Sequence, residues 1–139
     1  MTIQEELEAV RKKHKGILYP KDVVEAARTK TSAMHNEFDW DDTEAAQKWR
    51  LEQARHLIRV FVEVIGDSKK APSRVFVALR SEINHGGGYR LMTDVLNDEQ
   101  LRARLLNDAY NDMQAFTRKY ASLKELAGVF RAIRKIKSP

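Results

Sequence analysis

The chain has 139 residues and contains no cysteine, only three prolines and only six glycines. The lack of cysteine excludes disulfide scaffolds, thiol catalysis and cysteine-ligated zinc, and it fits a reducing compartment. No apolar stretch reaches the roughly 18 residues of a membrane span. The N-terminus, MTIQEELEAVRKKHKG, lacks the apolar core of a signal peptide. We therefore expect a cytoplasmic protein with no membrane partner.

Motifs for catalysis and cofactor binding are also missing. The four histidines, His14, His35, His56 and His85, include no i,i+4 pair that would place two imidazoles on one metal. The glycine run at 86–88 matches neither the Walker nor the dinucleotide-binding pattern, and no serine lies in a G-x-S-x-G elbow. We therefore predict that the protein is not an enzyme and has no catalytic residue, no metal and no cofactor.

The residues that are present favour a folded chain. Hydrophobic residues make up 42% and charged residues 32%, far from the composition of disordered chains. A chain of 139 residues is long enough to bury a core without disulfides or metals. We predict a single domain over 1–139, with an N-terminal helical half at 1–68 and a hairpin plus C-terminal helices at 73–139.

Apolar residues recur every three or four positions in five segments, the period of a helix with one buried face. They predict helices at 2–15, from about residue 22, near 44–65, at 97–120 and at 122–136. Trp49 lies in the middle of the third apolar stripe, so we expect it to be a core residue. In the last helix, the expected apolar face is Leu126, Val129, Phe130, Ile133 and Ile136.

Three of the predicted helices begin with residues typical of an N-terminal cap. Asp41 precedes Glu44 by three residues, the spacing of a capping box, and Asn97–Gln100 and Ser122–Glu125 repeat it. We interpret the acidic cluster Asp39, Asp41 and Asp42 as a helix cap; the alternative is a site for a cation or a basic partner. Phe38 and Trp40, just before the cap, are interpreted as an anchor into the core rather than a ligand cage.

The hydrophobic period shortens to two between the third and fourth predicted helices. In SRVFVALRSE (73–82), Val75, Val77 and Leu79 alternate with Arg74, Phe76, Ala78 and Arg80. A second alternating set, Tyr89, Leu91, Thr93 and Val95, follows in YRLMTDVL (89–96), and three consecutive glycines lie between the two runs. Such runs around a glycine-rich turn predict a β-hairpin. The expected fold is thus α+β and mainly α, with about five helices and one β-hairpin between the third and fourth helices.

Positive charge is concentrated at the C-terminal end. The net charge is +5; residues 1–72 are balanced, whereas residues 118–139 hold seven Lys or Arg and one acidic residue. A local field of this sign attracts anions, of which nucleic acid is the commonest. The alternative is an ordinary solvated face of a terminal helix. The candidate nucleic-acid-binding residues are Arg74, Arg80, Arg90, Arg118, Lys119, Lys124, Arg131, Arg134, Lys135 and Lys137.

Four segments resemble small uncharacterised proteins encoded by bacterial viruses and prophages. They are PKDVVEAAR (20–28), FDWDDTEAA (38–46), RLEQAR (50–55) and GGYR (87–90). The resemblance spans most of the chain and implies a bacterial cytoplasm and a small viral accessory or regulatory role. It implies no activity, cofactor or catalytic residue.

Two functions of different classes are left. The first is a non-enzymatic nucleic-acid-binding accessory or regulatory protein that contacts phosphates through the basic C-terminal helix and the hairpin arginines. The second is a protein-interaction or assembly module without a nucleic-acid contact. In that case the long third helix and an exposed hairpin edge pair with another chain, either a copy of itself or a host or viral protein.

Overall fold

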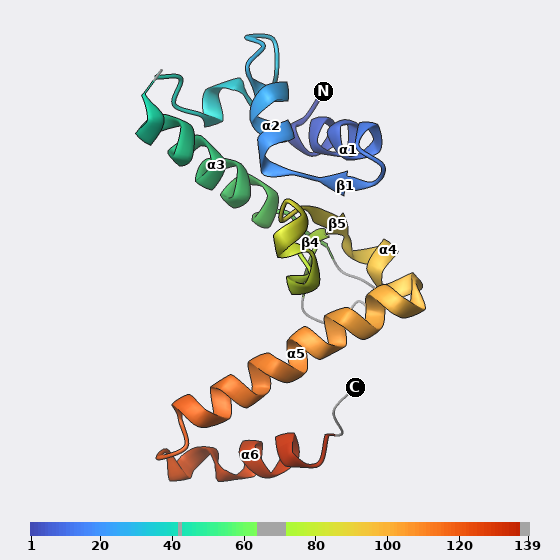
Figure 1. Cartoon of the computed structure of the whole chain (residues 1–139), viewed down its shortest axis with the longest axis vertical. Coiled ribbons are helices and arrows are strands. Elements are labelled where there is room, and N and C mark those ends of the chain that lie inside the picture. The colour runs from blue at the N-terminus through green and yellow to red at the C-terminus, as the bar shows by residue number, and fades with distance from the viewer. Residues whose placement is uncertain (42, 64–71, 137–139) are drawn as a thin grey trace. The chain divides into compact units, whose positions relative to one another are not determined.

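The computed structural model describes residues 1–41, 43–63 and 72–136 (Figure 1). Helices predominate and the sheets are small and antiparallel, which confirms the predicted α+β, mainly α class. Contacts group the chain into two compact units, Met1–Asp94 and Val95–Pro139. The hairpin lies within the first of these units. The single domain over 1–139, with halves at 1–68 and 73–139, stays a prediction.

The first unit begins with two helices whose ends are set by local sequence. Helix α1 (Ile3–Lys13) starts at a capping box, in which the Thr2 hydroxyl accepts from the Glu5 N–H and the Glu5 carboxylate accepts from the Thr2 N–H. Gly16, with φ +83°, lies just beyond the helix, in a left-handed conformation that glycine adopts without strain. Helix α2 (Pro20–Ala27) starts at Pro20, whose fixed φ suits a first helical position.

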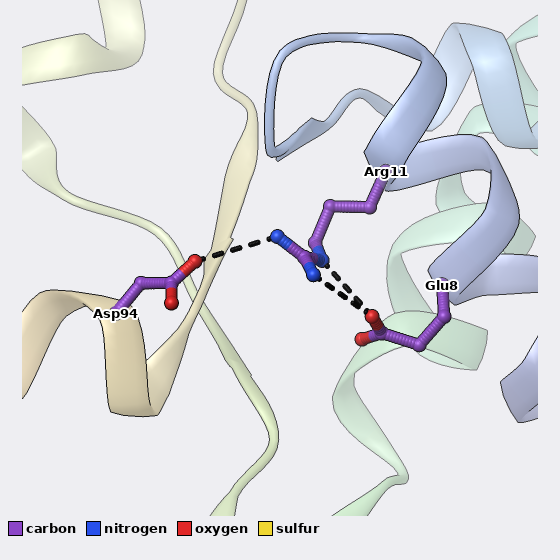
Figure 2. Close-up of polar contacts among 3 residues, drawn as sticks. All are labelled: Glu8, Arg11 and Asp94. Carbon is purple, nitrogen blue, oxygen red and sulfur yellow. Dashed lines mark hydrogen bonds and ion pairs between the residues drawn. The ribbon is translucent and has the colours of Figure 1, made fainter.

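Arg11 holds the end of α1 against a segment far along the chain. Its guanidinium contacts the Glu8 carboxylate through Nη2 at 2.9 Å and the Asp94 carboxylate through Nη1 at 3.4 Å (Figure 2). The Arg11 side chain is only 11% exposed, so these ion pairs are shielded from solvent on the arginine side. Two residues 83 positions apart are thereby joined within the first unit.

The core of the first unit is formed by residues from its helices and strands. Leu7, Leu18, Met34, Ile58 and Phe76 are almost completely buried in it. Phe38 is also buried there, and Trp40 packs against the same cluster, which confirms that this aromatic pair anchors the segment before the third helix.

Helix α3 (Glu44–Arg59) is shorter than predicted, and its cap is different. Thr43, not Asp41, is the N-cap: its hydroxyl accepts from the Ala46 N–H at 3.1 Å. The helix ends at Arg59 because the next residues become extended, with β2 (Val62–Glu63) pairing with β3 (Ser73–Arg74). Asp42 and the predicted end of the helix at residue 65 lie outside the described residues.

The expected core position of Trp49 is wrong, because its side chain is 54% exposed. The buried face of α3 is instead Ala46, Arg50, Ala54, Leu57 and Ile58. Trp49 lies one position away from Arg50, about 100° around the helix. The apolar spacing of the sequence fits both registers, and tertiary packing selects the one that buries an arginine.

The predicted hairpin is present, but its strands are short. Strands β4 (Phe76–Val77) and β5 (Tyr89–Leu91) pair antiparallel, and β1 (Ile17–Leu18) pairs with the other edge of β5. Alternation fails at Val75 and Phe76, which are both buried. The reason is that Val75 lies between the two sheets and its N–H donates to the Phe61 carbonyl at 3.0 Å.

Helical turns replace the outer parts of both predicted strands. A 3₁₀ helix, η2 (Arg80–His85), fills the connection, and Gly86, with φ +100°, ends it in the left-handed conformation. Residues Met92–Asn97 form helix α4 instead of continuing β5. Gly88 is needed for the sheet itself, since a Cβ there would lie 2.3 Å from Ile17 Cγ2 on β1.

The second unit contains a helical hairpin. Helix α5 (Glu99–Lys119) is followed by a 3₁₀ turn, η3 (Lys124–Leu126), and helix α6 (Ala127–Arg134), which folds back alongside α5 (Figure 1). The N-cap of α5 is Asp98, one residue after the predicted Asn97. The predicted Ser122 cap is wrong, because neither η3 nor α6 has a side-chain cap.

Candidate functional site

The C-terminal cations predicted to contact nucleic acid lie on exposed positions of the second unit. Arg118 and Lys119 occupy the last turn of α5, Lys124 lies in η3, Arg131 and Arg134 lie on α6, and Lys135 is its C-cap. Within the described part of the chain, none of them forms an ion pair with a carboxylate. Lys137 lies outside the described residues. This unit therefore presents cations that are not neutralised by described neighbours.

Helix α6 separates its apolar and cationic residues. Phe130 and Ile133 are buried, and the Phe130 ring packs against Phe116 of α5 at a centroid distance of 6.2 Å. Arg131, Arg134 and Lys135 follow at i, i+3 and i+4, the spacing that places side chains on one helix face. The predicted apolar face is only half correct, since Val129 is 47% and Ile136 is 45% exposed.

The hairpin arginines belong to the first unit, and they differ in exposure. Arg74 on β3 and Arg80 at the start of η2 are exposed. Arg90 on β5 is half-buried and forms a two-pronged ion pair with Glu82, with Nε at 2.8 Å and Nη2 at 2.7 Å from the carboxylate oxygens. A phosphate would therefore have to compete with Glu82 for Arg90.

Arg50 is a residue that the sequence reasoning missed. It is 3% exposed, and it is the one charged residue classed as buried within the described ranges. Its Nη1 atom donates to the main-chain oxygens of Asp39 at 2.9 Å and Asp41 at 2.6 Å. The sequence signal that could have identified it was its position four residues after Ala46 and four before Ala54, on a stripe whose other members are apolar.

Trp40 completes the surroundings of Arg50. The guanidinium carbons of Arg28 and Arg50 each lie 5.4 Å from the Trp40 ring centroid, a cation–π distance. The indole N–H donates to the His35 carbonyl at 2.8 Å, and the His35 ring stacks on the indole at 5.2 Å. The indole is thus fixed by His35 while its ring faces two cations.

Two hollows flank α3 in the first unit. One, of about 270 Å³, lies between α2 and α3 and is lined by Lys21, Val24, Glu25, Arg28, Gln47, Arg50 and Leu51. The other, of about 530 Å³, is lined by Glu37, Trp49, Glu52, Gln53, His56, Leu57 and Arg59. Glu52 in the second hollow is ion-paired with Arg55. The first hollow is richer in cations and contains the buried Arg50.

Metal clusters and membrane-spanning helices are both absent from the described ranges. No group of three or more His, Asp or Glu side chains there is arranged to hold a metal ion. None of the helices there is long and apolar enough to cross a membrane. Comparison of the chain with protein-family models, curated proteins and solved structures finds no match.

Proposed function

We propose that the protein is a small, non-enzymatic nucleic-acid-binding accessory or regulatory protein. The observation that carries the proposal is the exposed cationic face of α6, formed by Arg131, Arg134 and Lys135 without a described carboxylate partner. Helix α6 itself contains no acidic residue. The accessory or regulatory role is the one that the four phage-like segments led us to expect.

The packing of α6 explains how this face stays available. Phe130 and Ile133 hold the helix through its apolar side, so binding a phosphate leaves the core packing undisturbed. Each phosphate that the cations neutralise releases condensed counterions, which favours binding at low salt. Lys and Arg side chains that bind phosphate read no sequence information directly, so the interface we propose recognises backbone charge rather than bases.

The experiment is a binding titration with a fluorescently labelled mixed-sequence duplex at several salt concentrations. The test variant replaces Arg131, Arg134 and Lys135 with Ala, which leaves Phe130 and Ile133 in place. We expect weaker binding, and a salt dependence that is shallower by about 0.9 for each phosphate that the variant no longer neutralises.

A matched control removes the same charge from the first unit. Lys12, Lys13 and Lys30 are exposed there, and replacing all three with Ala changes the net charge equally. This control should bind the duplex with nearly the parental affinity. Equal weakening in both triple variants, or parental binding in the α6 variant, would remove α6 from the interface.

A second candidate function, assembly, is favoured by the apolar surface of the second unit. Leu106 is 54%, Leu123 45% and Val129 47% exposed, and α5 has no residue classed as buried. The edges of the three-stranded sheet provide few main-chain groups for pairing with another chain, because the edge strands β1 and β4 are two residues long. Sedimentation equilibrium of the parent and of Leu106→Glu tests it: a parental oligomer that the variant converts to monomer supports assembly, and a monomeric parent rejects it.

A further inference from the structure

Within the described part of the chain, most hydrogen-bond donors of the buried Arg50 have no acceptor. Its Nη1 donates to two main-chain oxygens, but the buried Nε has no hydrogen-bond partner there. Among the described residues, Nη2 also has no acceptor, and no carboxylate pairs with the guanidinium. A buried charge is costly unless it is paired. Carbonyl dipoles and the Trp40 ring offset part of this cost, but they do not neutralise the charge.

Further cations surround the hollow that Arg50 lines. Lys21 and Arg28 come from α2 and its C-cap, and Gln47 of α3 adds an amide to the same 270 Å³ space. Glu25 is the one acidic residue of this lining, and its carboxylate is 2.9 Å from Nε of Arg28. The three cations therefore leave a local charge of about +2 after Glu25 is counted.

The charge and size of the hollow select the class of ligand. A phosphate monoester carries a charge of about −1.5 to −2 at neutral pH, which balances this site, whereas a carboxylate supplies only one negative charge. A guanidinium presents its donors in a planar fork that matches phosphate oxygens. The space of 270 Å³ accommodates a phosphate group together with the first atoms of its substituent.

Arg50 is also held in place before any ligand arrives. Its Nη1 bonds to Asp39 and Asp41 fix one side of the guanidinium, and the ring of Trp40 faces the group at 5.4 Å. A fixed donor loses little conformational entropy on binding. We propose that the hollow between α2 and α3 binds a phosphate monoester group through Arg50, Arg28 and Lys21. This site lies in the first unit and does not depend on the cationic face of α6.

The test is an NMR titration of the full chain with inorganic phosphate as the probe, at constant ionic strength maintained with chloride. We expect saturable shifts of backbone amides in α2 and around Gln47, Arg50 and Leu51 of α3. The Nε–H signal of Arg50, identified by its loss in Arg50→Lys, should shift with the same affinity. Shifts that rise linearly without saturation would overturn the proposal.

Two variants locate the site. The double variant Lys21→Ala, Arg28→Ala removes two exposed side chains. It should weaken phosphate binding about tenfold or more, because the loss of one charged hydrogen bond lowers affinity about tenfold. Lys12→Ala with Lys13→Ala removes the same charge from α1 and should bind within about twofold of the parent. Parental affinity in the first variant, or an equal loss in both, would overturn the proposal. Arg50→Lys keeps the charge but not the fork, and its affinity should also fall.

The source of the phosphate is decided by two trithymidylates, one with a 5′-phosphate and one with a 5′-hydroxyl. Binding of the phosphorylated form alone would assign the site to the end of a nucleic acid. Binding of inorganic phosphate without either trithymidylate would assign it to a small free phosphate. Equal binding of both trithymidylates would overturn the requirement for a monoester. Failure of the α6 proposal changes none of these outcomes, since Arg131, Arg134 and Lys135 are intact throughout.

Discussion

The Nη1 atom of Arg50 donates a hydrogen bond to the main-chain oxygen of Asp41 over 2.6 Å. The same atom also reaches the Asp39 carbonyl, so one buried side chain of α3 holds the segment that precedes the helix. The acidic stretch before α3 thus uses its backbone, and not the carboxylates of these two residues, to bind a cation. The cap itself comes from Thr43.

Replacing Arg50 with Met should destabilise the protein, because it leaves the Asp39 and Asp41 carbonyls without their donor. An unsatisfied polar group costs about 1–3 kcal/mol when fully buried. Asp39 and Asp41 are exposed residues whose bonds to Arg50 are only partly buried, so we expect a loss of about 1–2 kcal/mol. Arg50→Lys should lose less, since an ammonium group still donates. Urea unfolding followed by circular dichroism measures both. Parental stability in Arg50→Met would show that the buried guanidinium costs as much as its bonds contribute.

Trp49→Ala should have almost no effect on the stability of the protein, whereas Trp40→Ala should strongly destabilise it. Trp49 is 54% exposed, and surface substitutions usually stay within about 0.5 kcal/mol. Trp40 packs on the core and donates to the His35 carbonyl, so its truncation should cost about 3–5 kcal/mol. Thermal unfolding of the two variants, measured in parallel, tests this prediction. Similar losses of stability in both would show that Trp49 is a core residue.

Thr43→Ala should cost about 1 kcal/mol through loss of the α3 cap. Asp41→Ala should stay near the parental stability, because its main-chain oxygen, which Arg50 uses, is retained. The measurement is the midpoint of chemical unfolding of each variant. The assignment of the cap fails if the aspartate variant loses more stability than the threonine variant.

Gly88→Ala should disrupt the pairing of β5 with β1. The new Cβ would lie 2.3 Å from Ile17 Cγ2 and 2.8 Å from Tyr19 Cε1, so the strands would have to separate, at a cost of about 1–3 kcal/mol. Gly87→Ala is the control: it meets no atom within 4 Å, and only its left-handed φ of +61° is strained. Amide hydrogen exchange of the paired residues Ile17, Leu18, Tyr89 and Arg90 should increase in the Gly88 variant alone.

Features that depend on neighbours in sequence were predictable. The end of α1 at a cluster of cations and Gly16 follows from interactions within a few residues, and so does the existence of α5. The charge excess at the C-terminus is likewise a property of composition. Cap positions were less accurate: Thr43 stands two residues after Asp41 and also fits a helix start, and only backbone geometry distinguishes them.

The candidate sites also differ in how much of them the local sequence predicts. The cations of α6 were predicted from the sequence, because an amphipathic terminal helix leaves few places for charged side chains except the surface. Arg50 was not, because its burial depends on Trp40 and on the carbonyls of Asp39 and Asp41 folding over it. Likewise, no local sequence pattern reveals that Glu82 forms an ion pair with Arg90.

Periodicity and composition along the chain were enough to predict the class of fold, the positions of most helices and the location of the positive charge. Packing between distant segments set which face of α3 is buried, where β5 ends and which cations have partners. Those outcomes depend on contacts such as Gly88 against Ile17 and Arg11 against Asp94, between residues far apart in the chain. Local propensity cannot specify such contacts, because their free energy arises only when both segments have been brought together.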